Sequence, residues 1–183
     1  AIDISTIGTT KVTSADGSRT VTVEVFDSTE DHVNVLKQCF DFDAIKTLFK
    51  RKDFTFCYDA LHGVQGPYAR KVFHEILGAP ESSLLNCVPK EDFGGHDSPS
   101  HGHADPNLAN ARELCDIMGV AKDGTAITGQ AKEPPSFGAA ADGDADRNMI
   151  LGSRFFVSPS DSLACIVENS ELIPYFAVKR GLF

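Results

Sequence analysis

Short β-type apolar runs and apolar patterns of helical period alternate along this chain of 183 residues. The runs at residues 54–58, 84–88 and 137–141 read as strands, and the segments that follow the first two carry helical spacing. This βαβαβ order predicts an α/β fold in which helices pack on the faces of a mixed sheet. Further strands are expected at residues 20–26 and 148–151.

Proline and glycine mark the expected helix boundaries. Three prolines each follow a plausible N-cap residue, which predicts helix starts at Gly66-Pro67, Asp105-Pro106 and Ser158-Pro159. The first two of these helices are expected to end at Gly78 and Gly119. An earlier pair is expected over residues 29–40 and 42–50, with Ser28 as the N-cap of the first and Asp31 three residues on. Residues 89–105 and 121–136 are expected to form loops.

The strongest chemical signal follows the expected strand 137–141. Residues 142–147 read Asp-Gly-Asp-Ala-Asp-Arg, so small residues separate three aspartates and let the backbone curl. Carboxylates that converge in this way repel one another unless a cation lies among them. Oxygen ligands suit Mg²⁺, Mn²⁺ or Ca²⁺, and Arg147 offers a planar fork to a phosphate group. The motif therefore predicts a divalent metal site of Asp142, Asp144 and Asp146, with room for a phosphoryl oxygen.

Three other interpretations of this motif are possible. A solvated acidic turn is the simplest of them. An EF-hand calcium loop would need glycine and glutamate where the chain has Arg147 and Ser153, so that interpretation fails. An aspartyl phosphatase would carry threonine or valine at position 146, where the chain has aspartate, and it stays as a weaker alternative.

Histidine and glycine clusters offer two further candidate sites. His96, His101 and His103 could bind zinc, but no fourth ligand recurs nearby, and an exposed loop is the favoured interpretation. The turn between His62 and Pro67 could face an anion with its amides. A turn that simply requires glycine is favoured there, because no GxGxxG pattern is present.

Charge and cysteine content narrow the possible environments. The chain has 26 acidic and 17 basic residues and a net charge of −9, and its densest basic run is residues 50–52. Nucleic-acid binding is therefore not expected. No apolar run approaches the roughly 20 residues of a membrane helix, so no membrane span is expected either. Five scattered cysteines without a CxxC pair, and no secretory signal, predict a reducing, cytoplasmic location.

The motif at 142–147 is similar to the metal-binding loop of the α-D-phosphohexomutases. The surrounding residues resemble the phosphoglucomutase branch of that family, which includes the parafusins. The matching stretches run from Ile2 nearly to the C-terminus, and they are Phe40-Asp-Phe-Asp43, His62-Gly-Val-Gln-Gly-Pro-Tyr68, Leu77-Gly-Ala-Pro-Glu81, residues 86–96, Asp105-Pro-Asn107, residues 147–152 and Pro159-Ser-Asp-Ser162.

The resemblance implies that the chain is the central part of a longer, four-domain protein. Residues 1–26 would be the tail of the first domain, residues 27–154 the second, metal-binding domain, and residues 155–183 the start of the third. The partners implied are the remaining domains and a phosphosugar substrate.

The activity implied is the interconversion of glucose 1-phosphate and glucose 6-phosphate through a phosphoserine and a bisphosphate intermediate. Asp142, Asp144 and Asp146 would hold Mg²⁺, while Asp146 and Arg147 would lie at the substrate and Arg147 would act in catalysis. Glucose 1,6-bisphosphate would activate the full-length enzyme. A parafusin-like role in regulated secretion is the alternative that this resemblance also implies.

Two departures from the family pattern limit what this chain could do alone. The Ser-His-Asn-Pro phosphoserine loop is absent, as are the sugar loop of the third domain and the phosphate loop of the fourth. Residues 97–102 read as an insertion, which affects how His96, His101 and His103 align. The chain alone is therefore expected to be inactive.

Overall fold

The computed structural model describes residues 3–96 and 98–178. The expected insertion and the two expected flanking domain segments therefore lie partly outside the described residues. Among the described residues, none of the helices combines the length and the apolar character that crossing a membrane would require.

A five-stranded mixed sheet lies at the centre of the fold, in the order β4-β3-β5-β6-β7. Strand β3 is parallel to both β4 and β5, whereas β6 is antiparallel to both of its neighbours, β5 and β7. The strands are β3 (Phe56–Asp59), β4 (Leu84–Leu85), β5 (Phe137–Ala141), β6 (Asn148–Gly152) and β7 (Phe155–Val157). The predicted α/β class with a mixed sheet is confirmed.

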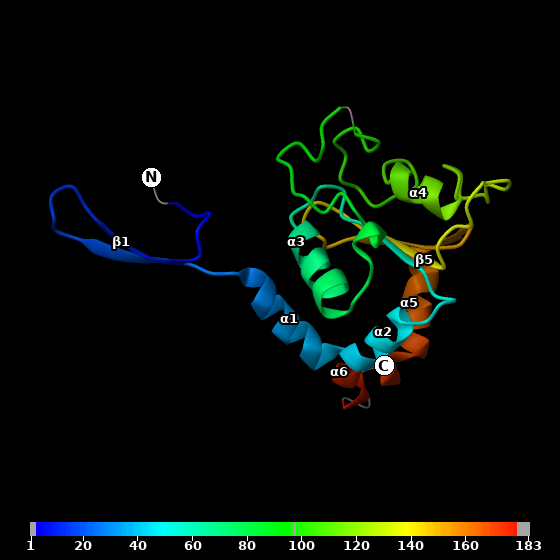
Figure 1. The fold of residues 1–183 in the computed structure, drawn as a ribbon, viewed down its shortest axis with the longest axis horizontal. Helices are drawn as coiled ribbons and strands as arrows, with labels where there is room; N and C mark the ends of the chain where they lie inside the picture. Colours follow the sequence, from blue (N-terminus) through cyan, green and yellow to red (C-terminus); the bar gives the residue numbers. More distant parts are fainter. Residues whose placement is uncertain (1–2, 97, 179–183) are drawn as a thin grey trace.

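Helices cover both faces of this sheet (Figure 1). They are α1 (Ser28–Cys39), α2 (Phe42–Phe49), α3 (Gly66–Ala69) with its π-helical continuation η1 (Arg70–Ile76), the short 3₁₀ turns η2 (Glu81–Ser83) and η3 (Ser170–Leu172), α4 (Arg112–Met118), α5 (Pro159–Glu168) and α6 (Pro174–Ala177). Because side chains alternate between the faces of a strand, β3 contributes side chains to the helix layers on both faces of the sheet. Cys57 packs in the cluster of α4, and Tyr58 packs in the cluster of α3.

A β-hairpin precedes this domain and projects away from it (Figure 1). Its strands β1 (Gly8–Thr13) and β2 (Thr20–Val25) pair antiparallel, from Gly8 opposite Val25 to Thr13 opposite Thr20. All of β1 and most of β2 are exposed, so the hairpin contributes nothing to the core around the sheet.

Side chains that compete for backbone hydrogen bonds explain where the predicted helix starts were wrong. Helix α4 begins at Arg112 rather than after Pro106, because Asn107 Oδ1 accepts hydrogen bonds from Ala109 N and Asn110 N, both at 2.9 Å, and stabilises a turn. Helix α1 is capped by Asp27, not Ser28. The predicted cap Ser158 is confirmed, since its hydroxyl accepts from Asp161 N at 3.2 Å.

Two strands had no prediction and one was predicted too long. The strands Gly8–Thr13 and β7 were missed. Strand β4 stops at Leu85 rather than residue 88, because Asn86 takes a φ of 53°, which breaks the extended conformation. The prediction for β5 agrees at both ends.

Candidate metal centre

Strand β5 brings the acidic motif to the carboxyl edge of the sheet. Its small residues let α4 pack directly on it, since a Cβ atom at Gly138 would lie 2.7 Å from Met118 Sδ. Ala140 and Met118 are both fully buried at this contact. Asp142 follows the last residue of β5, at the edge of the sheet where α/β proteins gather their ligands.

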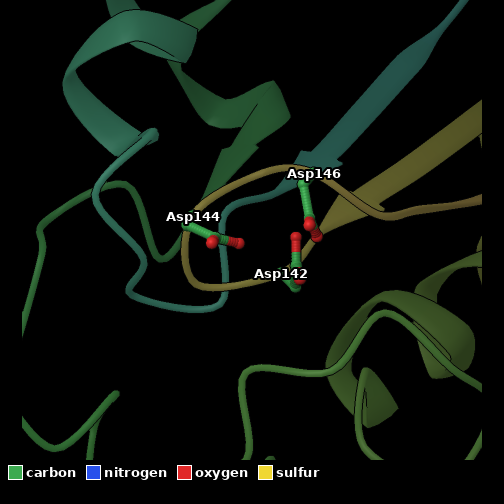
Figure 2. A group of neighbouring side chains, drawn as sticks. All are labelled: Asp142, Asp144 and Asp146. Carbon is green, nitrogen blue, oxygen red and sulfur yellow. The ribbon is translucent and has the colours of Figure 1, made fainter.

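The three predicted metal ligands converge in the structure. One oxygen from each of Asp142, Asp144 and Asp146 lies within 4.8 Å of the others. Asp142 is 1% exposed, whereas Asp144 and Asp146 are exposed to solvent. Figure 2 shows the three side chains pointing from different sides of the loop toward one common space.

A tight turn produces this convergence. Ala145 N donates to Asp142 O at 3.2 Å, and Asp142 N donates to Arg147 O at 3.3 Å. Ala145 closes the turn with a φ of 64°, the left-handed conformation that few side chains favour. The alternate aspartates therefore face inward.

Arg147 donates two hydrogen bonds to Asp142, the buried member of the three aspartates. Its backbone N donates to Asp142 Oδ1 at 3.0 Å and its Nε donates to Asp142 Oδ2 at 2.8 Å. Its guanidinium also pairs with Asp146 and, at 3.3 Å, with Asp105. The Arg147 side chain remains 64% exposed, so it is accessible to an incoming anion.

The buried Asp142 and the exposed Asp146 have opposite pKa shifts. Burial raises the pKa of Asp142, but the hydrogen bonds from the backbone and side chain of Arg147 outweigh it and hold that pKa below its usual value. The pKa of Asp146 is raised by its hydrogen bond with Asp142 and by the charges of Asp144 and Asp142. The repulsion is therefore expressed mainly at Asp146, and a divalent cation would relieve it.

The donor set fits a hard divalent cation. Three carboxylates supply oxygen ligands, and two of them are open to water or to a phosphoryl oxygen, as Mg²⁺ prefers. In the described parts of the chain, no other three metal-binding side chains of the acidic, histidine or cysteine type come together. His96, His101 and His103 are exposed, and His101 Nδ1 lies 3.0 Å from the His96 carbonyl oxygen.

The turn that follows β3, residues 60–66, packs against the aspartate loop, residues 142–147. Val64 N donates to Gly143 O at 2.9 Å. A Cβ atom at Gly63 would lie 2.7 Å from that same oxygen, and one at Gly66 would lie 2.2 Å from Cys87 O. This turn therefore requires glycine for close backbone contact, as predicted.

Sequence patterns did not reveal the contact of Asp105 with the aspartate loop, or the buried position of Asp59 at the end of β3. Asp105 was interpreted as a helix cap, but its carboxylate faces Arg147. Asp59 is fully buried and accepts from Leu61 N at 2.9 Å and from Asn86 Nδ2 at 3.0 Å. A polar residue at the end of an apolar strand was the available signal for Asp59, whereas Asp105 had none.

Comparison with known proteins identifies the family. A family model described as "Phosphoglucomutase/phosphomannomutase, alpha/beta/alpha domain II" matches residues 30–154. The chain belongs to the phosphoglucomutase/phosphomannomutase family. The matched segment contains the sheet through β6 and the whole aspartate loop, so the predicted resemblance is confirmed.

Plant relatives match almost the whole chain. The chain is 59% identical over 177 residues to "Probable phosphoglucomutase, cytoplasmic 2" of Arabidopsis thaliana and 56% identical over 177 residues to "Phosphoglucomutase, cytoplasmic" of Populus tremula. Each match covers 96% of this chain and 28% of the relative. The chain therefore spans just over a quarter of the length of these relatives.

A solved structure shares the fold. The exocytosis-sensitive phosphoprotein pp63/parafusin, a phosphoglucomutase from Paramecium, superposes with a TM-score of 0.81 at 44% identity in its open form. The match covers 94% of this chain and 28% of that protein. The second-domain type of fold predicted for the chain is thus confirmed.

The buried carboxyl of Asp59 gives a pH-dependent prediction. Burial is the main reason that its pKa is raised, although hydrogen bonds from Asn86 and Leu61 oppose the shift. The folded state therefore holds this proton more tightly than the unfolded state. The resulting stabilisation is complete below the ordinary pKa of 3.8 and is lost as the pH rises through the folded-state value.

Asp59→Asn keeps an acceptor oxygen and cannot ionise, so it should be more stable than the wild type at pH 7. Each unit of pKa difference is worth about 1.4 kcal/mol, so the gain should be visible as a higher melting temperature. Melting curves from about pH 3.5 to about pH 8 should show the gain disappearing toward acid. Asp123→Asn is the control, because the pKa of that exposed carboxyl is lowered by Thr125. An Asp59→Asn protein that is less stable at every pH would contradict this account.

Proposed function

We propose that this chain is the metal-binding domain, with flanking segments, of a protein that interconverts glucose 1-phosphate and glucose 6-phosphate. The observation that carries the proposal is the convergence of Asp142, Asp144 and Asp146 within 4.8 Å, in a segment that matches the second-domain family model. In this scheme a phosphoserine on another domain and a bisphosphate intermediate carry the phosphoryl group.

The three aspartates would hold Mg²⁺ by one oxygen each. When bound, Mg²⁺ would offset the negative charge of the phosphoryl group during transfer. Arg147 keeps Asp142 ionised through two hydrogen bonds and, being largely exposed, can present its remaining donors to a sugar phosphate. Asp146 lies on the exposed side of the cluster, where it would border the substrate.

The family match supports one part of the proposed domain division, the second domain. Residues 27–154 would form the second domain, which agrees with the matched range 30–154. Residues 1–26 would belong to the first domain, and their hairpin is exposed along most of its length. Residues 155–183 would begin the third, although β7 still pairs with β6. The remaining domains are thus the partners that would supply the phosphoserine and grip the sugar.

Activity would then require the longer protein. Phosphoryl transfer depends on positioning, and losing orientation alone can raise a barrier by roughly 7–11 kcal/mol. This chain by itself should therefore not turn over glucose phosphates, and glucose 1,6-bisphosphate would act as activator only of the complete enzyme. We place that enzyme in the cytoplasm, as the names of the plant relatives indicate for those proteins.

Two alternative functions, a parafusin-like binding role and an aspartyl phosphatase, are supported to different degrees by the observations. A parafusin-like binding role in regulated secretion is favoured by the similarity to the exocytosis-sensitive phosphoprotein of Paramecium. An aspartyl phosphatase would use Asp142 as nucleophile, but that side chain is 1% exposed and both its oxygens accept hydrogen bonds from Arg147. The phosphatase is therefore the weaker of the two.

Metal binding tests the aspartate site directly. The chain should bind Mg²⁺ or Mn²⁺ weakly, with a dissociation constant on the order of 1 mM, because no phosphoryl ligand completes the site. Asp144→Ala removes one ligand and should weaken binding by more than about tenfold. Calorimetry or manganese relaxation measures both. Asp123→Ala, an exposed loop aspartate outside the cluster, should bind as the wild type does. Equal binding by Asp144→Ala and the wild type would refute the site.

Turnover tests the role of Arg147 in a protein that carries all the family's domains. Arg147→Lys keeps the charge but loses the fork, so the rate should fall by about 100-fold while the melting temperature changes little. The matched control is Arg154→Lys, since Arg154 forms a two-point ion pair with Glu133 outside the aspartate loop. An unchanged rate in Arg147→Lys would mean that the guanidinium has no part in catalysis. A protein without glucose phosphate turnover that still binds Mn²⁺ would favour the parafusin-like role.

A further inference from the structure

The two carbonyl groups on either side of Asp142 are both held by the turn of residues 60–66. Val64 N donates to Gly143 O at 2.9 Å, and Gln65 Nε2 donates to Ala141 O at 3.2 Å. The main chain of the most buried predicted metal ligand is therefore anchored before and after it. The first anchor is a backbone amide, and the second is a side chain that a substitution can remove.

Gln65 occupies a buried position between two strand ends. Its side chain is 7% exposed, and Nε2 also donates to Ala60 O at 2.8 Å. Strands β3 and β5 are paired as far as Asp59 opposite Ala140. The Gln65 amide therefore connects the two residues that come next along the chain, Ala60 and Ala141. Since both neighbours are carbonyl oxygens, the amide nitrogen must be the atom that faces them.

We infer that Gln65 is a positioning residue for the aspartate loop. Its side-chain hydrogen bond would continue the pairing of β3 and β5 by one residue, to Ala141, directly before Asp142. A ligand loop that is held in place before the cation arrives loses less conformational freedom on binding. Hydrogen bonds behind the ligands of a metal site commonly change its affinity by tenfold or more.

The inference rests on the proposed function in one respect, the binding of a divalent cation. Gln65 carries no charge, so replacing it leaves the net charge around the three carboxylates unchanged. A change in affinity would then report geometry rather than charge. The loop itself offers a second readout that needs no metal, because Ala145 N and Arg147 N donate to Asp142.

The test compares Gln65→Met with Gln130→Met. Methionine is similar in length and cannot donate a hydrogen bond. Gln130 is a matched control, because its Nε2 donates to the Asp116 carbonyl at 2.6 Å, at the end of α4 and away from the aspartate loop. Gln65→Met should bind Mn²⁺ about tenfold more weakly than the wild type. Its Ala145 and Arg147 amides should exchange about fivefold faster without metal, because one of the two hydrogen bonds that the substitution removes is the one to Ala141 O, directly before the loop.

Both measurements are made below the melting transition of every variant. Gln130→Met should change neither the affinity nor the exchange of these amides, even where it lowers the melting temperature. Gln65→Met with wild-type affinity and wild-type exchange would overturn the inference, as would equal changes in both variants. If the wild type binds no Mn²⁺, the metal proposal fails, and the exchange rates still decide whether Gln65 positions the loop.

Discussion

Repulsion among three carboxylates is the interaction around which this domain is arranged. Asp142, Asp144 and Asp146 bring an oxygen each within 4.8 Å, and Asp105 adds a fourth negative charge beside Arg147. A single guanidinium cannot balance four carboxylates, and the raised pKa of Asp146 shows the remaining repulsion. Such a cluster persists only where the rest of the structure holds it together or a cation binds to it.

The surrounding fold supplies that restraint with uncharged groups. Met118 packs closely on Gly138 of β5, the strand that leads into the loop. Beyond the strand, Val64 and Gln65 bond to the carbonyl groups on either side of Asp142. The backbone is therefore fixed by hydrogen bonds and packing that do not use the carboxylate oxygens, although both oxygens of Asp142 also accept hydrogen bonds from Arg147. A preformed cation site requires that its loop be held in place by groups other than the ligand oxygens.

Local patterns in the sequence predicted the centre of the site but not its supports. Small residues before alternating aspartates define both β5 and the loop, so residues 137–141 and the three converging aspartates could be found directly. The start of α4 was missed because the Asn107 side chain stabilises a turn. Asp105 and Gln65 depend on contacts between segments distant in the chain, as does the pairing of β7, and no local pattern encodes such contacts.

The most direct test of this account is a crystal of the chain soaked with Mn²⁺ and measured for anomalous scattering. The account predicts one strong peak within about 2.0–2.3 Å of an oxygen from each of Asp142, Asp144 and Asp146, the distances typical of such small divalent ions. Arg147 should remain bonded to Asp142. A peak among His96, His101 and His103 instead, or no peak at the aspartates at a concentration that saturates binding in solution, would contradict it.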